Sequence, residues 1–268
     1  GDITVGELRG FSGSGDEILY LGYPSESTNI DLYAVHVDTG VVRRLTSHPE
    51  YADPIAFSRD DEWFVAMDTR GSDRQMWMAG LRGIPPLIDV VAVTAAASTR
   101  NNGARRFFQP FLVDRHGDRG AYFGQRVNAG GDGRPGAIND ADWNGRADPA
   151  FSPDGTRIVY WQALVSAPAC GGANPLPCPT STAQGGREYR VMLANLTNRE
   201  PAAPKKVHAV PDYLPWATPF IPGTLPPSPL VVPPGTYTLD GQVSGHATVQ
   251  FSGHPRITRI AVNYTEYS

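Results

Sequence analysis

The sequence predicts an all-β protein in which about four β-propeller blades, part of a larger propeller, are followed by a C-terminal β module. One pattern of apolar and turn residues recurs along the chain, which is the signature of a repeat architecture. The 268 residues include 29 Gly and 25 Pro, as expected for many short elements joined by turns. No stretch has the periodicity of an amphipathic helix longer than about three turns.

The repeat opens with a Phe that precedes a turn. Its clearest copies begin at Phe11, Phe57 and Phe151, and a weaker copy begins at Phe111. Neighbouring openers are about 47 residues apart on average, which lies within the range of propeller blade lengths. The spacing therefore predicts one blade for each opener.

Each unit is expected to contain four antiparallel strands. The first ends in a Ser-Pro-Asp-Gly type of turn, where Pro presets φ and Gly accepts a positive φ. In the last unit a second strand is expected at 158–161. In the first unit a third strand is expected at 31–37, and Asp38-Thr39-Gly40 should turn it into a fourth at 41–46. Such a blade must stack on its neighbours to bury both of its faces.

The chain divides into three parts by composition. Residues 1–210 are predicted to form the blades of a partial propeller. Residues 211–234 contain nine prolines and are predicted to be a semi-rigid linker. Residues 235–268 alternate apolar and polar side chains and are predicted to begin a β-sandwich-like module. Since four blades are few for a propeller, we expect a second chain, most simply the N-terminal half of the same precursor.

Two resemblances add to this interpretation. The stretch Phe151–Tyr160 (FSPDGTRIVY), preceded by Asp148-Pro149, resembles the repeat of TolB-type β-propellers. Four segments across the chain are similar to the C-terminal half of fungal saponin hydrolases: Leu45–Pro54 (LTSHPEYADP), Asp68–Met76 (DTRGSDRQM), Ser98–Pro110 (STRNNGARRFFQP) and Cys170–Pro175 (CGGANP). Members of that family are secreted glycosidases that cleave the glucuronide bond of soyasaponin-type triterpene saponins. The resemblance implies this reaction class and a glucuronide substrate, and no cofactor is expected.

A glycosidase needs two carboxyl groups that flank the bond to be cleaved. The repeat predicts that Asp53-Pro54, Gln109-Pro110 and Asp148-Pro149 each head an innermost strand, at the mouth of the central channel. Asp53 and Asp148 are therefore the predicted catalytic pair. Glu50 is a nearby substitute, and His48 is a candidate proton shuttle. The alternative is structural, because an Asp before Pro often caps a turn or locks neighbouring blades.

Binding of a glucuronate carboxylate calls for the two-pronged donor of arginine. The predicted loops at the same end of the blades contain a group of candidate substrate-binding residues: Arg70, Arg74, Arg100, Asn101, Arg105, Gln109 and Trp143. The alternative for the arginines is salt bridging between blades, with Asp68 and Asp73 as partners.

The remaining motifs concern the compartment. Cys170 and Cys178 are predicted to form a local disulfide, since no further Cys or His lies nearby to complete a metal site. Asn195 and Asn263 begin glycosylation sequons, so a secreted, extracellular protein is expected.

Nucleic-acid and membrane partners are not expected. The net charge is −4 and no basic face is clustered. The longest apolar tract, 84–97, is too short and too interrupted to span a bilayer.

Two alternative functions stay open. The chain could belong to a non-catalytic propeller that binds a carbohydrate or a protein. It could also belong to a uronate lyase on the same fold. A lyase would need a metal or an arginine–tyrosine pair to acidify the carbon next to the carboxylate.

Overall fold

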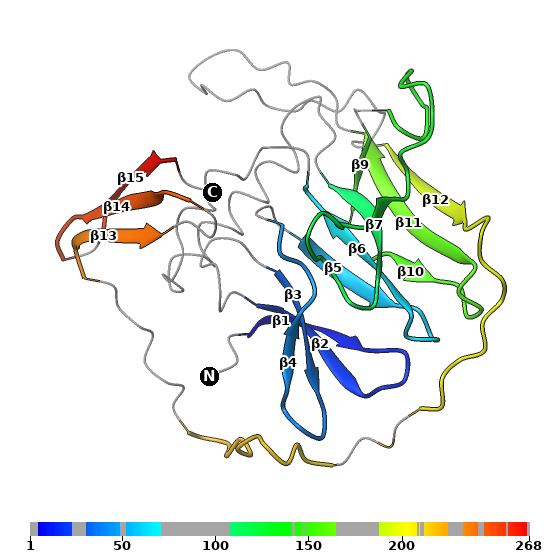
Figure 1. Ribbon diagram of the computed structural model, residues 1–268, viewed down its shortest axis with the longest axis horizontal. Helices are drawn as coiled ribbons and strands as arrows, with labels where there is room; N and C mark the ends of the chain where they lie inside the picture. Colours follow the sequence, from blue (N-terminus) through cyan, green and yellow to red (C-terminus); the bar gives the residue numbers. More distant parts are fainter. Residues whose placement is uncertain are drawn as a thin grey trace.

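The computed structural model describes residues 5–22, 31–48, 52–70, 108–140, 143–146, 148–164, 188–207, 209, 212–224, 233–240, 244–255 and 257–266. These residues form β-strands, turns and extended segments, arranged in four antiparallel sheets (Figure 1). Among them no helix is long and apolar enough to cross a membrane. The predicted all-β fold class is confirmed.

Three four-stranded sheets follow one another in the chain, and we call them the first, second and third blades. The first contains β1 (Val5–Phe11), β2 (Glu17–Gly22), β3 (Asp31–His36) and β4 (Val42–Arg44). The second contains β5 (Ala52–Phe57), β6 (Trp63–Asp68), β7 (Gln109–Asp114) and β8 (Gln125–Arg126). The third contains β9 (Trp143–Gly145), β10 (Ala150–Phe151), β11 (Arg157–Leu164) and β12 (Tyr189–Asn195).

The strong repeat copies mark the innermost strand of each blade. Phe11, Phe57 and Phe151 end β1, β5 and β10. Each pairs with the residue that begins or nearly begins the next strand: Ile18, Phe64 and Ile158, respectively. The predicted turn chemistry is also present, since Gly155 has a φ of 72° and donates its N–H to the carbonyl of Ser152 at 2.9 Å.

The weak copy at Phe111 does not open a blade. Phe111 lies within β7, the third strand of the second blade, and pairs with Ala66 of β6. The pattern misled because β7 is also an apolar strand that ends in an Asp-and-Gly turn, in which Gly117 donates to the Asp114 carbonyl at 3.0 Å. The described part of the chain therefore contains three blades, whereas the sequence predicted four.

Successive side chains along a strand point to opposite faces of the blade, so the two faces of one blade can pack on two different neighbouring blades. Leu19 and Leu32 of the first blade belong to one buried cluster with Phe64 and Val113 of the second. On the opposite face of the second blade, Val65 clusters with residues of the third, among them Ile158 and Tyr160. The second blade is thus packed on both faces, as a propeller blade requires.

The chain after β12 returns along one edge of the blades (Figure 1). We call its described residues, 196–207, 209 and 212–224, the strap. Backbone N–H groups of Ala202 and Lys205 donate to the carbonyls of Asp154 and Arg59, at 3.0 and 2.9 Å. The indole N–H of Trp216 donates to the Val37 carbonyl at 2.9 Å. The strap therefore contacts the turns at the same end of all three blades.

The C-terminal sheet contains β13 (Gly235–Asp240), β14 (His246–Ser252) and β15 (Arg259–Thr265) in that order. Val249 and Phe251 of β14 are buried against Tyr237, Ile257, Ile260 and Val262. The alternation of side chains that predicted a β module from residue 235 onwards thus corresponds to one buried face. The predicted domain boundaries at 210 and 234 remain predictions.

Candidate functional site

The innermost strand of each blade is interrupted by a bulge. The pairing with the next strand shifts between Leu8 and Gly10 in β1 and between Ala52 and Ile55 in β5. In the third blade, β9 and β10 both pair with β11, and residues 146–149 separate them. Bulges redirect side chains and are common beside active sites. The bulges contain Arg9, Asp53 and Asp148, which define the candidate site.

Asp53 is buried and forms an ion pair with Arg9. One guanidinium nitrogen of Arg9 contacts the Asp53 carboxylate, and the same nitrogen lies 2.9 Å from the exposed Glu7 carboxylate. The side chain of Asp53 is only 7% exposed. The pair joins the innermost strands of the first and second blades. This is the geometry that the structural alternative for Asp53 expects.

Asp148 has a different environment, although the repeat predicted an equivalent one. It is exposed and has a φ of 68°. No hydrogen bond or ion pair joins it to another described residue. It borders a hollow of about 360 Å³ that is also lined by Val159, Tyr160, Trp161, Tyr189, Arg190 and Val191. Of the two predicted catalytic carboxylates, Asp148 is therefore the one that a ligand can reach.

Aromatic rings form much of this hollow. The rings of Trp161 and Tyr189 meet edge to face, with centroids 5.5 Å apart. Arg190 lies 4.2 Å over the ring of Trp143 and donates to Gln162 at 2.9 Å. Burial lowers the pKa of Arg190 from its ordinary value. Trp143, a predicted substrate-binding residue, is itself buried beneath this arginine.

Gln109 does not head an innermost strand, and this prediction was wrong. It begins β7, where it pairs with Asp68 of β6. Gln109 is buried, and its side-chain oxygen accepts a hydrogen bond from Asn128 at 2.6 Å. The dipeptide Gln-Pro resembles Asp-Pro, but its strand lies two positions away from the channel.

Arg70 is held inside the second blade. Its guanidinium contacts the carboxylates of Asp68 at 2.6 Å and Asp118 at 3.0 Å, and it donates to the Phe123 carbonyl at 2.6 Å. It also lies 5.0 Å from the ring centre of Phe111. Asp68 is the partner that the salt-bridge alternative named. Asp118 carried no signal of this role in the sequence.

The burial of this group shifts its titration. Complete burial raises the pKa of Asp68 above its usual range, although the positive charge and hydrogen bonds of Arg70 oppose the shift. Burial alone would lower the pKa of Arg70, but the carboxylates of Asp68 and Asp118 outweigh that effect and raise it. His48, the candidate proton shuttle, contributes a weaker charge effect on Asp68 and packs edge-on against Phe123.

Several predicted residues lie outside the described part of the chain: Glu50, Arg74, Arg100, Asn101, Arg105, Cys170 and Cys178. Their predicted roles stay predictions. The sequon residues Asn195 and Asn263 are exposed, in β12 and β15. Within the described ranges, no group of three or more His, Cys, Asp or Glu could hold a metal ion.

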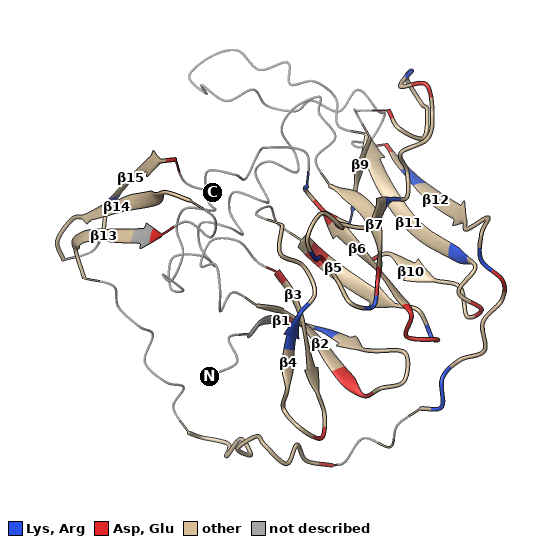
Figure 2. Cartoon of the chain, in the orientation of Figure 1, with Lys and Arg blue, Asp and Glu red and all other residues tan. Residues whose placement is uncertain are grey.

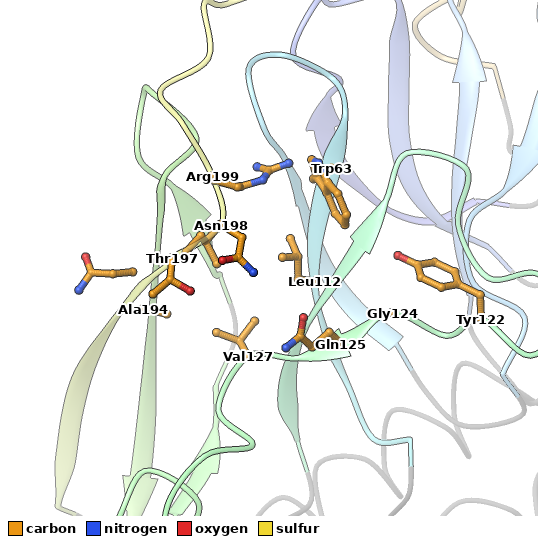
Figure 3. Close-up of a pocket in the computed structure, with 12 residues that line it drawn as sticks. Trp63, Leu112, Tyr122, Gly124, Gln125, Val127, Ala194, Thr197, Asn198 and Arg199 are labelled. Atoms are coloured by element: carbon orange, nitrogen blue, oxygen red, sulfur yellow. The ribbon is translucent and has the colours of Figure 1, made fainter.

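A second hollow, of about 410 Å³, lies between the second and third blades, and no sequence motif indicated it (Figure 3). Trp63, Tyr122, Gln125 and Asn198 are among its lining residues. The guanidinium of Arg199 lies 4.7 Å over the Trp63 ring at one end. This hollow is near the turns that the strap contacts and is separate from the inner-strand bulges.

Comparison with known proteins gives little beyond the fold. No family model matches the chain, and no curated protein matches it. Among solved structures, it is similar to a protein assigned as TolB from Agrobacterium tumefaciens, with 17% identity and a TM-score of 0.39. The match covers 70% of this chain and 45% of that chain, so the chain spans less than half of the matched protein. The fold assignment rests on the sheets described above.

Proposed function

We propose that the chain is part of a secreted glycoside hydrolase that cleaves the glucuronide bond of a soyasaponin-type triterpene saponin. The sequence resemblance supports this reaction class. One structural observation carries the proposal furthest: Asp148 is an exposed carboxylate on an inner-strand bulge, beside a hollow lined by Trp161 and Tyr189. Aromatic faces suit both sugar rings and a triterpene skeleton.

The two predicted carboxylates would have different roles. Arg9 contacts the carboxylate of Asp53, and a carboxylate is the group that acts as nucleophile or base in this reaction. Asp148 is exposed beside the hollow, where its carboxyl group would face the leaving-group oxygen as the general acid. In this proposal Arg100 and Arg105 would bind the glucuronate carboxylate, assisted by Asn101.

A non-catalytic propeller that binds a carbohydrate is the second candidate. It is favoured by the engagement of Asp53 with Arg9 and of Arg70 with Asp68 and Asp118. A binding protein needs accessible aromatic and polar groups but no pair of converging carboxylates. The hollow beside Asp148 would then be a binding surface only.

The test is an assay of soyasaponin hydrolysis by the chain combined with the N-terminal half of its precursor. We expect release of the aglycone, and a fall of about 1,000-fold or more in kcat/KM for Asp148→Asn. Asp132→Asn is the matched control, because Asp132 is also exposed and does not line the hollow beside Asp148.

Other products would identify the alternatives. Saponin binding without release, by a folded and assembled protein, would favour the binding propeller. Formation of an unsaturated uronate would favour the lyase, for which Tyr189 and Arg190 are candidate residues because both line the hollow. A double Asp53→Asn/Asp148→Asn variant tests the pair, provided that its unfolding curve shows that it still folds.

A further inference from the structure

One face of the third blade carries apolar side chains that nothing in the described structure covers. Val159 and Trp161 of β11 are 38% and 37% exposed, and Val191 and Leu193 of β12 are 75% and 59% exposed. Val159 pairs with Leu193, and Trp161 pairs with Val191, so the four side chains form one continuous patch. We call this patch the open face.

The same positions are buried in the other two blades. In the second strand of each blade, these positions lie one and three residues after the residue that pairs with the opening Phe. In the first blade these are Leu19 and Leu21, which are 1% and 3% exposed. In the second blade they are Val65 and Met67, both 0% exposed. Only in the third blade are they exposed.

The cross-strand partners repeat the pattern. Leu19 and Leu21 pair with Ala34 and Leu32, which are fully buried. This face of the first blade belongs to the cluster shared with the second blade, and Val65 belongs to the cluster shared with the third. This face of the first blade thus packs on the second blade, and the same face of the second blade packs on the third. The open face is therefore the next interface in the same series.

Charge is absent from the middle of the open face. Figure 2 shows β11 and β12 in tan along most of their length, with blue near one end of each strand. On the open face the basic residue is Arg157, which pairs with Asn195, whereas Arg190 lies on the opposite face of the sheet and donates to Gln162. An apolar centre with a polar rim is the composition of a specific protein interface.

We propose that the open face is the docking surface for a further propeller blade, contributed by the N-terminal half of the same precursor. Its facing side would present aromatic and branched aliphatic residues, as Phe64 and Val113 do towards the first blade. The proposal does not depend on the glycosidase activity. It does bear on the candidate site, because Arg9 and Asp53 show that neighbouring inner-strand bulges meet across such an interface. Val159, Trp161 and Val191 line the hollow beside Asp148 as well as the open face, so the docked blade would form the opposite wall of that hollow and narrow it to a cleft.

A second copy of this chain is a poorer occupant. Head-to-tail docking would need the opposite face of the first blade, which carries Tyr20, Tyr33 and Val35. These three residues are buried in a cluster with Trp216 of the strap. A second copy would therefore have to displace the strap before it could offer a matching face.

The experiment measures binding without substrate. The chain is mixed with the proposed partner, the N-terminal half of the precursor, and the complex is measured by sedimentation velocity and titration calorimetry. We expect a one-to-one complex. The variant Val191→Glu/Leu193→Glu should weaken it about 100-fold or more, because two carboxylates would be buried without partners. Val207→Glu/Ile221→Glu is the matched control, since both residues are 70% exposed and lie on the strap.

Three outcomes would overturn the proposal. The first is that no complex forms although both polypeptides are folded. The second is a complex that the Val191→Glu/Leu193→Glu variant forms as well as the parent chain does. The third is self-association of the chain that this variant abolishes, which would identify a second copy as the occupant. Since the exposed side chains make few contacts in the chain itself, unchanged unfolding midpoints are expected and confirm that the variants fold.

Discussion

Arg9 of β1 and Asp53 of β5 form an ion pair that joins the innermost strands of two neighbouring blades. Both residues lie where a bulge interrupts their strand, so each bulge turns its side chain towards the other blade. The Arg9 side chain is 18% exposed and that of Asp53 is 7% exposed. The pair is therefore largely shielded from water, so removal of one partner should strongly destabilise the protein.

Arg9→Met should destabilise the protein by about 3 kcal/mol, because it leaves the Asp53 carboxylate buried without its partner. The free energy of unfolding in urea, measured at neutral pH, tests this. Glu7→Gln removes the exposed partner of the same arginine and should change the stability by less than about 0.5 kcal/mol. Equal losses of unfolding free energy in the two variants would show that the contact with Asp53 contributes no more to stability than the contact with Glu7.

Arg70→Met should also destabilise the protein, by about 3–5 kcal/mol, since it leaves the buried carboxylates of Asp68 and Asp118 facing each other. The double variant Asp68→Asn/Arg70→Met removes one of the two charges and should recover part of the loss. Urea unfolding of the single and double variants provides the measurement. An Arg70→Met variant with parental stability would restore the predicted role of Arg70 in substrate binding.

The contact between Trp216 and the first blade should hold the strap in place. Trp216→Ala removes the indole that packs on Tyr20, Tyr33 and Val35 and donates to the Val37 carbonyl. We expect a loss of about 2 kcal/mol, because the indole is only partly buried. Trypsin should also cleave faster after Lys205 and Lys206 of the strap.

Phe220→Ala is the control for Trp216→Ala, because Phe220 is 78% exposed on the same strap. Its cleavage rate and stability should match those of the parent chain. Parental cleavage of Trp216→Ala would mean that the backbone hydrogen bonds of Ala202 and Lys205 are enough to hold the strap.

The strands and turns could be predicted from the sequence because their signals are local. Turn residues such as Asp154 and Gly155 fix the backbone where they stand, and the alternation of apolar residues fixes which strands follow. The error at Phe111 shows the limit of such signals. An apolar strand followed by an Asp-and-Gly turn looks the same whether it is the first or the third strand of a blade.

The candidate site was less predictable because its geometry depends on residues far apart in the chain. No local pattern indicates that Arg9 would reach Asp53, or that Asp118 would reach Arg70. The repeat placed Asp53 and Asp148 in similar positions, but a neighbouring blade buries only Asp53. The exposure of Asp148 therefore depends on which blades surround it, and a motif of two residues carries no such information.

The titration of Asp154 tests the hydrogen bonds that stabilise the turn between β10 and β11. Its carboxylate accepts hydrogen bonds from the Ser152 hydroxyl and from the backbone and hydroxyl of Thr156. These bonds, that from Ser152 first, lower the pKa of Asp154 to about 2. Since the folded pKa lies below the unfolded value, the stabilisation is complete above pH 3.8 and is lost as the pH falls towards 2. Two-dimensional NMR of the side-chain carboxyl should show this titration directly.

The Asp154→Asn variant tests how much this carboxylate contributes to the loss of stability in acid. It should lose less stability than the parent chain between pH 4 and pH 2, because it has no carboxylate to protonate in this turn. Asp132→Asn removes another exposed carboxylate, which has no such set of donors, and is the control for the substitution itself. If Asp154→Asn and the parent chain lose stability in parallel, the hydrogen bonds of this turn do not contribute to the acid sensitivity of the blade.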